Sequence, residues 1–104
     1  MISAEALNDR IVETLKTIED PELGVNIYDL GLIYDILIEQ NRDVTITMTL
    51  TSVGCPVGEL LVKQVKRYLS KLDEVQSIEV NLVFEPPWDP NQMSEEVRLE
   101  LGML

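Results

Sequence analysis

The residue with the most distinctive chemistry in this 104-residue chain is Cys55, its single cysteine. It lies in the segment Thr51-Ser52-Val53-Gly54-Cys55-Pro56-Val57, between an expected strand and an expected helix. Because proline suits the first position of a helix, the thiol should face unpaired amides and the positive end of the helix dipole, which favour the thiolate. The thiolate is the form that binds soft metals. The competing interpretation is an inert, buried cysteine, which is a common fate of a free thiol.

Two carboxylates flank a proline in the segment Asp20-Pro21-Glu22. They are candidates for acid–base chemistry or for hard-oxygen metal ligation at a common site. The alternative is that Asp20 accepts turn amides while Glu22 is simply solvated. Thr51, at the end of an expected strand just before Cys55, is either β-branched filling or a hydroxyl within reach of a ligand at Cys55.

Hydrophobic periodicity predicts the element order α-β-β-α-β-α. The first helix begins after Ser3 as N-cap and ends near Asp20, because Pro21 disfavours helix at the preceding residue. Its buried face is Leu7, Ile11, Leu15 and Ile18. The second helix has the apolar stripe Val57, Leu61, Val65, Tyr68 and Leu72. A short last helix follows Ser94, with Val97, Leu101 and Leu104 on its apolar side.

Period-two alternation predicts three strands. Their inward residues are Tyr34, Ile36 and Ile38 in the first, Val44, Ile46, Met48 and Leu50 in the second, and Ile78, Val80, Leu82 and Phe84 in the third. One apolar face per strand predicts a sheet covered by helices on one face only. We therefore expect a two-layer α+β single domain over residues 1–104, with the first strand central and antiparallel pairing. Trp88, between prolines, packs on the apolar layer or anchors a partner.

Charge, hydropathy and composition each argue against one kind of protein or site. With 19 acidic and 8 basic residues the net charge is −11, which argues against nucleic-acid binding. Half of the basic residues share one helical stripe, interpreted as a solvated face: Lys63, Lys66, Arg67 and Lys71. No signal peptide or membrane-spanning segment is recognisable, so a cytoplasmic protein is expected. The absence of histidine and the single cysteine exclude an ordinary structural zinc site within one chain.

Several motifs together resemble the metal–sulfur cluster biosynthesis family, also described as iron–sulfur cluster assembly domains. The matching segments, in order, are Asp20-Pro21-Glu22, Tyr28-Asp29-Leu30-Gly31-Leu32-Ile33-Tyr34, Met48-Thr49-Leu50-Thr51, Cys55-Pro56 and Pro86-Pro87-Trp88. The resemblance spans roughly residues 8–92. Family members often have Thr-Thr-Pro where this chain has Thr51-Ser52-Val53. The chain also lacks the extra C-terminal cysteines of PaaD-like members, so it is more similar to SufT-like proteins.

The resemblance implies a factor that matures iron–sulfur proteins, with Asp20, Glu22, Thr51 and Cys55 as the matching site residues. It implies iron–sulfur scaffold or client proteins as partners. Because a cluster usually needs four ligands, one cysteine per chain leaves a labile cluster shared between two chains in a homodimer, completed by small thiols, or held at an interface with a scaffold or client. In each case Cys55 is the metal ligand.

Two other functions remain open at this point. One is an adaptor that holds no cluster and uses Trp88 and the apolar segment 23–33 as its contact surface. The other is a thiol enzyme with Cys55 as nucleophile and Asp20 or Glu22 as base. The absence of histidine counts against the enzyme, because cysteine nucleophiles usually depend on a nearby imidazole.

Overall fold

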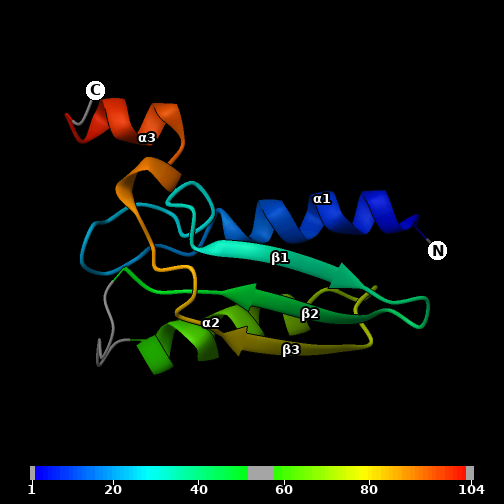
Figure 1. The fold of residues 1–104 in the computed structure, drawn as a ribbon. Coiled ribbons are helices and arrows are strands. Elements are labelled where there is room, and N and C mark those ends of the chain that lie inside the picture. The colour runs from blue at the N-terminus through cyan, green and yellow to red at the C-terminus, as the bar shows by residue number, and fades with distance from the viewer. Residues whose placement is uncertain (1, 52–57, 103–104) are drawn as a thin grey trace.

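The computed structural model describes residues 2–51 and 58–102, and Cys55 lies outside these ranges. The order of elements is the expected one (Figure 1). The helices are α1 (Ala4–Leu15), α2 (Gly58–Ser70) and α3 (Glu95–Glu100), with a short 3-10 turn, η1, at Pro90–Gln92. The strands are β1 (Ile33–Ile38), β2 (Asp43–Met48) and β3 (Ser77–Leu82). The α+β class is therefore confirmed.

The order of strands in the sheet differs from the expected one. The order is β1-β2-β3, so β2 is central, and β3 pairs with it in parallel rather than with β1. A tight turn connects β1 to β2 as an antiparallel hairpin, with Arg42 at φ 71°. The connection from β2 to β3 contains α2, and a helical crossover of this kind returns the chain parallel to the strand that it left. The prediction of a central first strand was wrong, because the crossover places β3 directly beside β2 with no strand between them.

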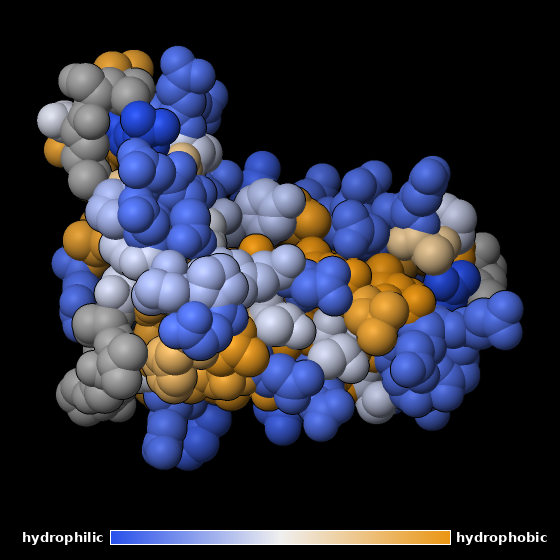
Figure 2. Space-filling view, viewed as in Figure 1, coloured by the Kyte–Doolittle hydropathy of each residue, from blue (hydrophilic) through white to orange (hydrophobic). Residues whose placement is uncertain are grey.

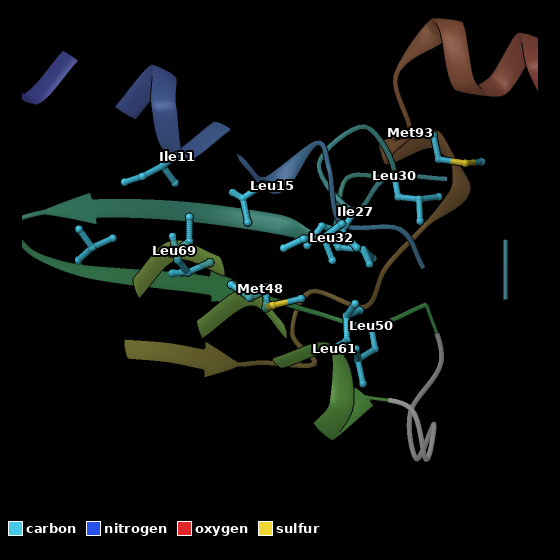
Figure 3. Close-up of a cluster of buried hydrophobic side chains, with 14 of the residues drawn as sticks. Ile11, Leu15, Ile27, Leu30, Leu32, Met48, Leu50, Leu61, Leu69 and Met93 are labelled. Atoms are coloured by element: carbon cyan, nitrogen blue, oxygen red, sulfur yellow. The ribbon is translucent and has the colours of Figure 1, made fainter. Parts of the chain in front are cut away.

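The helices cover one face of the sheet, as expected. Helix α1 lies against β1 and α2, and α2 lies against β3. Figure 3 shows the core between helices and sheet, with side chains from α1, α2, β2 and the 27–32 segment pointing toward one another. The inward residues of β2 (Val44, Ile46 and Met48) are at most 1% exposed. On the other face Thr45 and Thr47 remain partly accessible.

The N-terminal helix matches its expected start and face but ends early. Ser3 caps it by accepting a hydrogen bond from the Ala6 amide at 3.1 Å. The last helical residue is Leu15, five residues before the expected end. Ile18 lies beyond the helix, in a loop, and is still buried. Its carbonyl accepts the Ile27 amide at 2.9 Å. Pro21 therefore marks the loop rather than the helix end.

In α2 the core stripe is confirmed at Leu61 and Val65 and also includes Leu69, which the sequence interpretation missed. Tyr68 and Leu72 are half-buried, and Val57 lies outside the described residues. The four expected surface cations of this helix are all exposed.

The ends of two strands were predicted too far along the chain. Strand β2 ends at Met48. Thr49 follows it and is buried, although the alternation of the strand would place it on the exposed face. Its amide donates to the Leu32 carbonyl at 2.9 Å. Strand β3 ends at Leu82, and at this end Leu82 and Phe84 are 36% and 38% exposed instead of buried in the core.

The proline-rich segment after β3 crosses the start of β1. Trp88 packs partly buried against the core and donates its Nε1–H to the Leu30 carbonyl at 2.8 Å. Gly31 at φ 82° lies so close to the Gln92 backbone that a Cβ there would meet its carbonyl carbon at 2.8 Å. Helix α3 starts after Ser94 as expected and buries only Val97. Within the described residues, no helix is long and apolar enough to cross a membrane.

Candidate functional site

Two segments that the sequence singled out lie at the same end of the molecule. The loop 19–25 and the chain leaving β2 both reach the end of the sheet opposite the β1–β2 turn (Figure 1). Ile18 and Ile27, which flank the loop, share one core cluster with Leu50, which precedes Thr51. The fold therefore brings the Asp-Pro-Glu loop and the start of the Cys55 segment toward one region.

Asp20 organises its own loop. Its side chain is only 4% exposed, and its Oδ1 accepts hydrogen bonds from the Glu22 amide at 2.8 Å and the Leu23 amide at 3.2 Å. Its own amide donates to the Val25 carbonyl, and its carbonyl accepts the Gly24 amide. Among the described residues no donor reaches Oδ2. Asp20 thus accepts turn amides, as the structural alternative proposed.

The other two predicted site residues in the described ranges, Glu22 and Thr51, are more exposed than Asp20. The Glu22 side chain is exposed, and Thr51 is half-buried in a bend three residues beyond the end of β2. The predicted contact of Thr51 with a ligand at Cys55 lies outside the described residues, as does the position of Pro56 at the start of α2. Within 2–51 and 58–102, no three potential metal-binding side chains converge.

Gly58, the first residue after the Cys55 segment, is the first residue of α2 and packs against Leu50. A Cβ at this position would lie 2.5 Å from Leu50 Cδ1. The first residue of α2 therefore packs directly against the residues that follow β2. This contact places Leu50 and Gly58, which lie on either side of the Cys55 segment in the sequence, against each other.

An apolar surface lies near the start of α2 and the end of β3. Leu60 is 57% exposed on the first turn of α2, and Leu82 and Phe84 are exposed at and just after the end of β3. Helix α2 packs against β3, and Figure 2 shows hydrophobic surface where these two ends meet. Sequence reasoning missed this surface because it assigned Leu82 and Phe84 to the core.

A second feature that sequence reasoning missed is a pocket of about 200 Å³ between the 16–29 segment and α3. Its lining carries four carboxylates and one lysine: Glu19, Asp29, Glu96, Glu100 and Lys16. Asn26 and Asp29 exchange two hydrogen bonds that shape one wall, at 2.8 and 2.9 Å. No local sequence pattern could indicate this pocket, because its walls are some 70 residues apart in the chain.

The model of the family described as "Iron-sulfur cluster assembly protein" matches residues 8–82 of this chain. That span includes the Asp20 loop, the whole sheet and the Cys55 segment. The chain belongs to the iron–sulfur cluster assembly protein family. The resemblance noted from the motifs is thereby confirmed.

Individual relatives match over nearly the whole chain. The chain is 44% identical over 99 residues to the Fe-S protein maturation auxiliary factor YitW of Bacillus subtilis, covering 95% of this chain and 97% of that protein. It is 44% identical over 84 residues to the Fe-S protein maturation auxiliary factor SufT of Staphylococcus aureus, covering 81% and 96%. A crystal structure of a domain of unknown function, DUF59, from Bacillus anthracis superposes with a TM-score of 0.89 at 42% identity, covering 96% of this chain and 95% of that one.

Proposed function

We propose that this protein is an auxiliary factor in iron–sulfur protein maturation that carries a cluster, or iron, and passes it to client proteins through Cys55. Family membership and the names of the relatives support the maturation role. The single thiol supports transfer rather than storage, because one cysteine supplies only one of the four ligands that a cluster usually requires. The remaining ligands come from a second chain, small thiols or the protein that receives the cluster.

The observation that carries the proposal is the arrangement around the Cys55 segment. Gly58 packs against Leu50, and both flank the segment that contains the thiol. Asp20, in the loop at the same end of the molecule, has one carboxylate oxygen free of hydrogen bonds within the described residues. Asp20, Glu22 and Thr51 would tune the site or assist iron, since carboxylates are hard-oxygen ligands.

The partners in this proposal are the scaffold that supplies the cluster and the client that receives it. The exposed Leu60, Leu82 and Phe84 give such proteins an apolar contact surface. Neither a nucleic acid nor a membrane has a role in this function. The proposed setting is the cytoplasm, where a reducing environment keeps a lone cysteine as a free thiol.

Anaerobic reconstitution with iron and sulfide tests the proposal. The wild-type protein should develop the visible absorption of a cluster, with a yield that depends on added small thiol or on protein concentration. Cys55→Ser should remain colourless and should fail to activate an apo-client protein. Thr45→Val, on the open face of the sheet and near the β1–β2 turn, is the matched control and should behave as wild type.

An adaptor without a cluster is the second candidate, and the exposed apolar surface favours it. Trp88 donates its indole N–H to Leu30 and packs on the core, so the contact residues that we propose for this adaptor are Leu60 and Phe84. If Cys55→Ser still supports client maturation while Leu60→Ser or Phe84→Ser abolishes it, the carrier proposal fails and the adaptor stands.

A further inference from the structure

The outer side of α1 carries a row of carboxylates. This row, the α1 stripe, consists of Glu5, Asp9 and Glu13. All three residues are exposed and lie four positions apart, on the side of the helix opposite to its buried residues. They span about 12 Å along the helix axis. The next exposed cation, Lys16, directs its Nζ toward the Tyr28 ring, 5.5 Å from the centroid.

The outer side of α2 carries the opposite charge at the same spacing. This row, the α2 stripe, consists of Lys63 and Arg67 on α2 and Lys71 directly after its last residue. These residues are also exposed, Lys66 lies beside them, and Lys71 Nζ lies 5.6 Å from the centroid of the Tyr68 ring. Half of the eight basic residues of an otherwise strongly acidic chain are therefore gathered on α2 and the residue that follows it.

Within the described residues, no member of either stripe forms an ion pair. In the described part of the chain, the ion pair is that of Arg10 with Glu74, at 2.9 Å, and neither residue belongs to a stripe. Like charges four residues apart destabilise a helix. The helix dipole accounts for a carboxylate in the first turn of α1 and a cation in the last turn of α2. It does not account for Glu13 near the C-terminal end of α1. On α2 the exposed Glu59, four residues before Lys63, is the exception to the single sign of the outer side.

We propose that the two stripes form the contact surface for a second copy of this chain. Helices α1 and α2 contact each other on the same face of the sheet and run in opposite directions (Figure 1). A twofold axis between the two helical layers can therefore place each acidic stripe on the basic stripe of the other copy. The two copies then meet antiparallel, with the Glu5 end of one stripe at the Lys71 end of the other. Leu60, 57% exposed on α2, adds apolar surface.

The charge pattern favours this occupant over other anionic partners. A nucleic acid or an anionic membrane would be repelled by the net charge of −11. A second copy carries the same net charge, but unlike those partners it also presents a basic stripe to the acidic one, and the contacting stripes are closer than the screening length of about 8 Å at physiological salt. The second copy also supplies three carboxylates at the same spacing as the three cations. The dimer would bring two Cys55 residues into one assembly, but its formation does not depend on the proposed cluster transfer.

Sedimentation velocity of the full chain tests the dimer. At 0.05 M NaCl and rising protein concentration, the apparent mass should increase from 11.8 kDa toward twice that value. Raising the salt to 0.5 M should weaken association by about tenfold, because the ion pairs are screened. A protein that stays monomeric at several hundred micromolar in low salt would overturn the proposal.

Charge reversal identifies the surface. One triple variant is Glu5→Lys, Asp9→Lys and Glu13→Lys, and the other is Lys63→Glu, Arg67→Glu and Lys71→Glu. Each alone should be monomeric, but an equimolar mixture should form a heterodimer, because each stripe again meets its opposite. The variant with all six changes keeps the net charge and should dimerise like the wild type. Circular dichroism monitors folding. Dimerisation of either triple variant alone, or failure of both the mixture and the six-site variant, would refute the stripes as the interface.

Discussion

Replacing Asp20 by alanine should destabilise the fold mainly through its loop. The side chain is 4% exposed, and its Oδ1 accepts the amides of Glu22 and Leu23 at 2.8 and 3.2 Å. A hydrogen bond to a charged group contributes about 1.5–3 kcal/mol. Because the second bond is long and residues 22 and 23 are exposed, water can solvate both amides in the variant. We therefore expect a loss of about 2 kcal/mol, near the lower end of this range.

The assays are thermal unfolding and urea unfolding, both followed by circular dichroism. In the thermal experiment, a loss of this size should lower the melting temperature by about 10 °C in a domain of this length. In urea, the midpoint should fall without a change in slope, since the area exposed on unfolding is almost unchanged. The control is Asp73→Ala, which removes an exposed carboxylate, and it should change stability by less than about 0.5 kcal/mol.

Asp20→Asn separates the structural role from a role in the site. The amide oxygen can still accept the two backbone N–H groups, so most of the stability should remain. If Asp20 also serves cluster transfer through its second oxygen, this variant should fold like the wild type but transfer poorly. The reasoning about the loop is refuted if Asp20→Ala is no less stable than the Asp73→Ala control.

Two further changes test other contacts. Gly31→Ala should cost about 3 kcal/mol in thermal unfolding, combining a left-handed φ with a clash against Gln92. Its control, Gly24→Ala, has φ 67° with open space around it and should cost only about 1 kcal/mol; equal losses would contradict the packing argument. Trp88→Phe should cost about 1 kcal/mol by deleting the hydrogen bond to Leu30, and an unchanged urea midpoint would show that this bond contributes nothing.

The sequence predicted those features that depend on short-range physics. The spacing of Leu7, Ile11 and Leu15 identified the buried face of α1, and Ser3 identified its start. The alternation in β2 identified its core residues. The ordered motifs indicated the family, which the match over residues 8–82 confirms. The roles of Cys55, Glu22 and Thr51 in a site stay predictions.

Other features were decided only by the tertiary structure. The sheet order depends on how α2 packs after the hairpin has formed, so the alternation within each strand could not choose between a central β1 and a central β2. The exposure of Phe84 follows from where β3 stops pairing with β2. The acidic pocket beside α3 arises because a loop near residue 25 meets a helix near residue 97.

Asp20 and Cys55 illustrate the same division. Sequence by itself determined that a single thiol must share any cluster it holds, because the number of cysteines is a property of composition. It also determined which segments form helices and strands, because periodicity and capping act over a few residues. The hydrogen bonds of Asp20 to the amides of residues 22 and 23 are local, and they were among the alternatives that the sequence offered. Only the tertiary structure decided that the Asp20 loop and the start of the Cys55 segment lie at the same end of the molecule and that α1 and α2 present opposite charges on the same side. These two properties depend on contacts between residues distant in the chain, which no local pattern specifies.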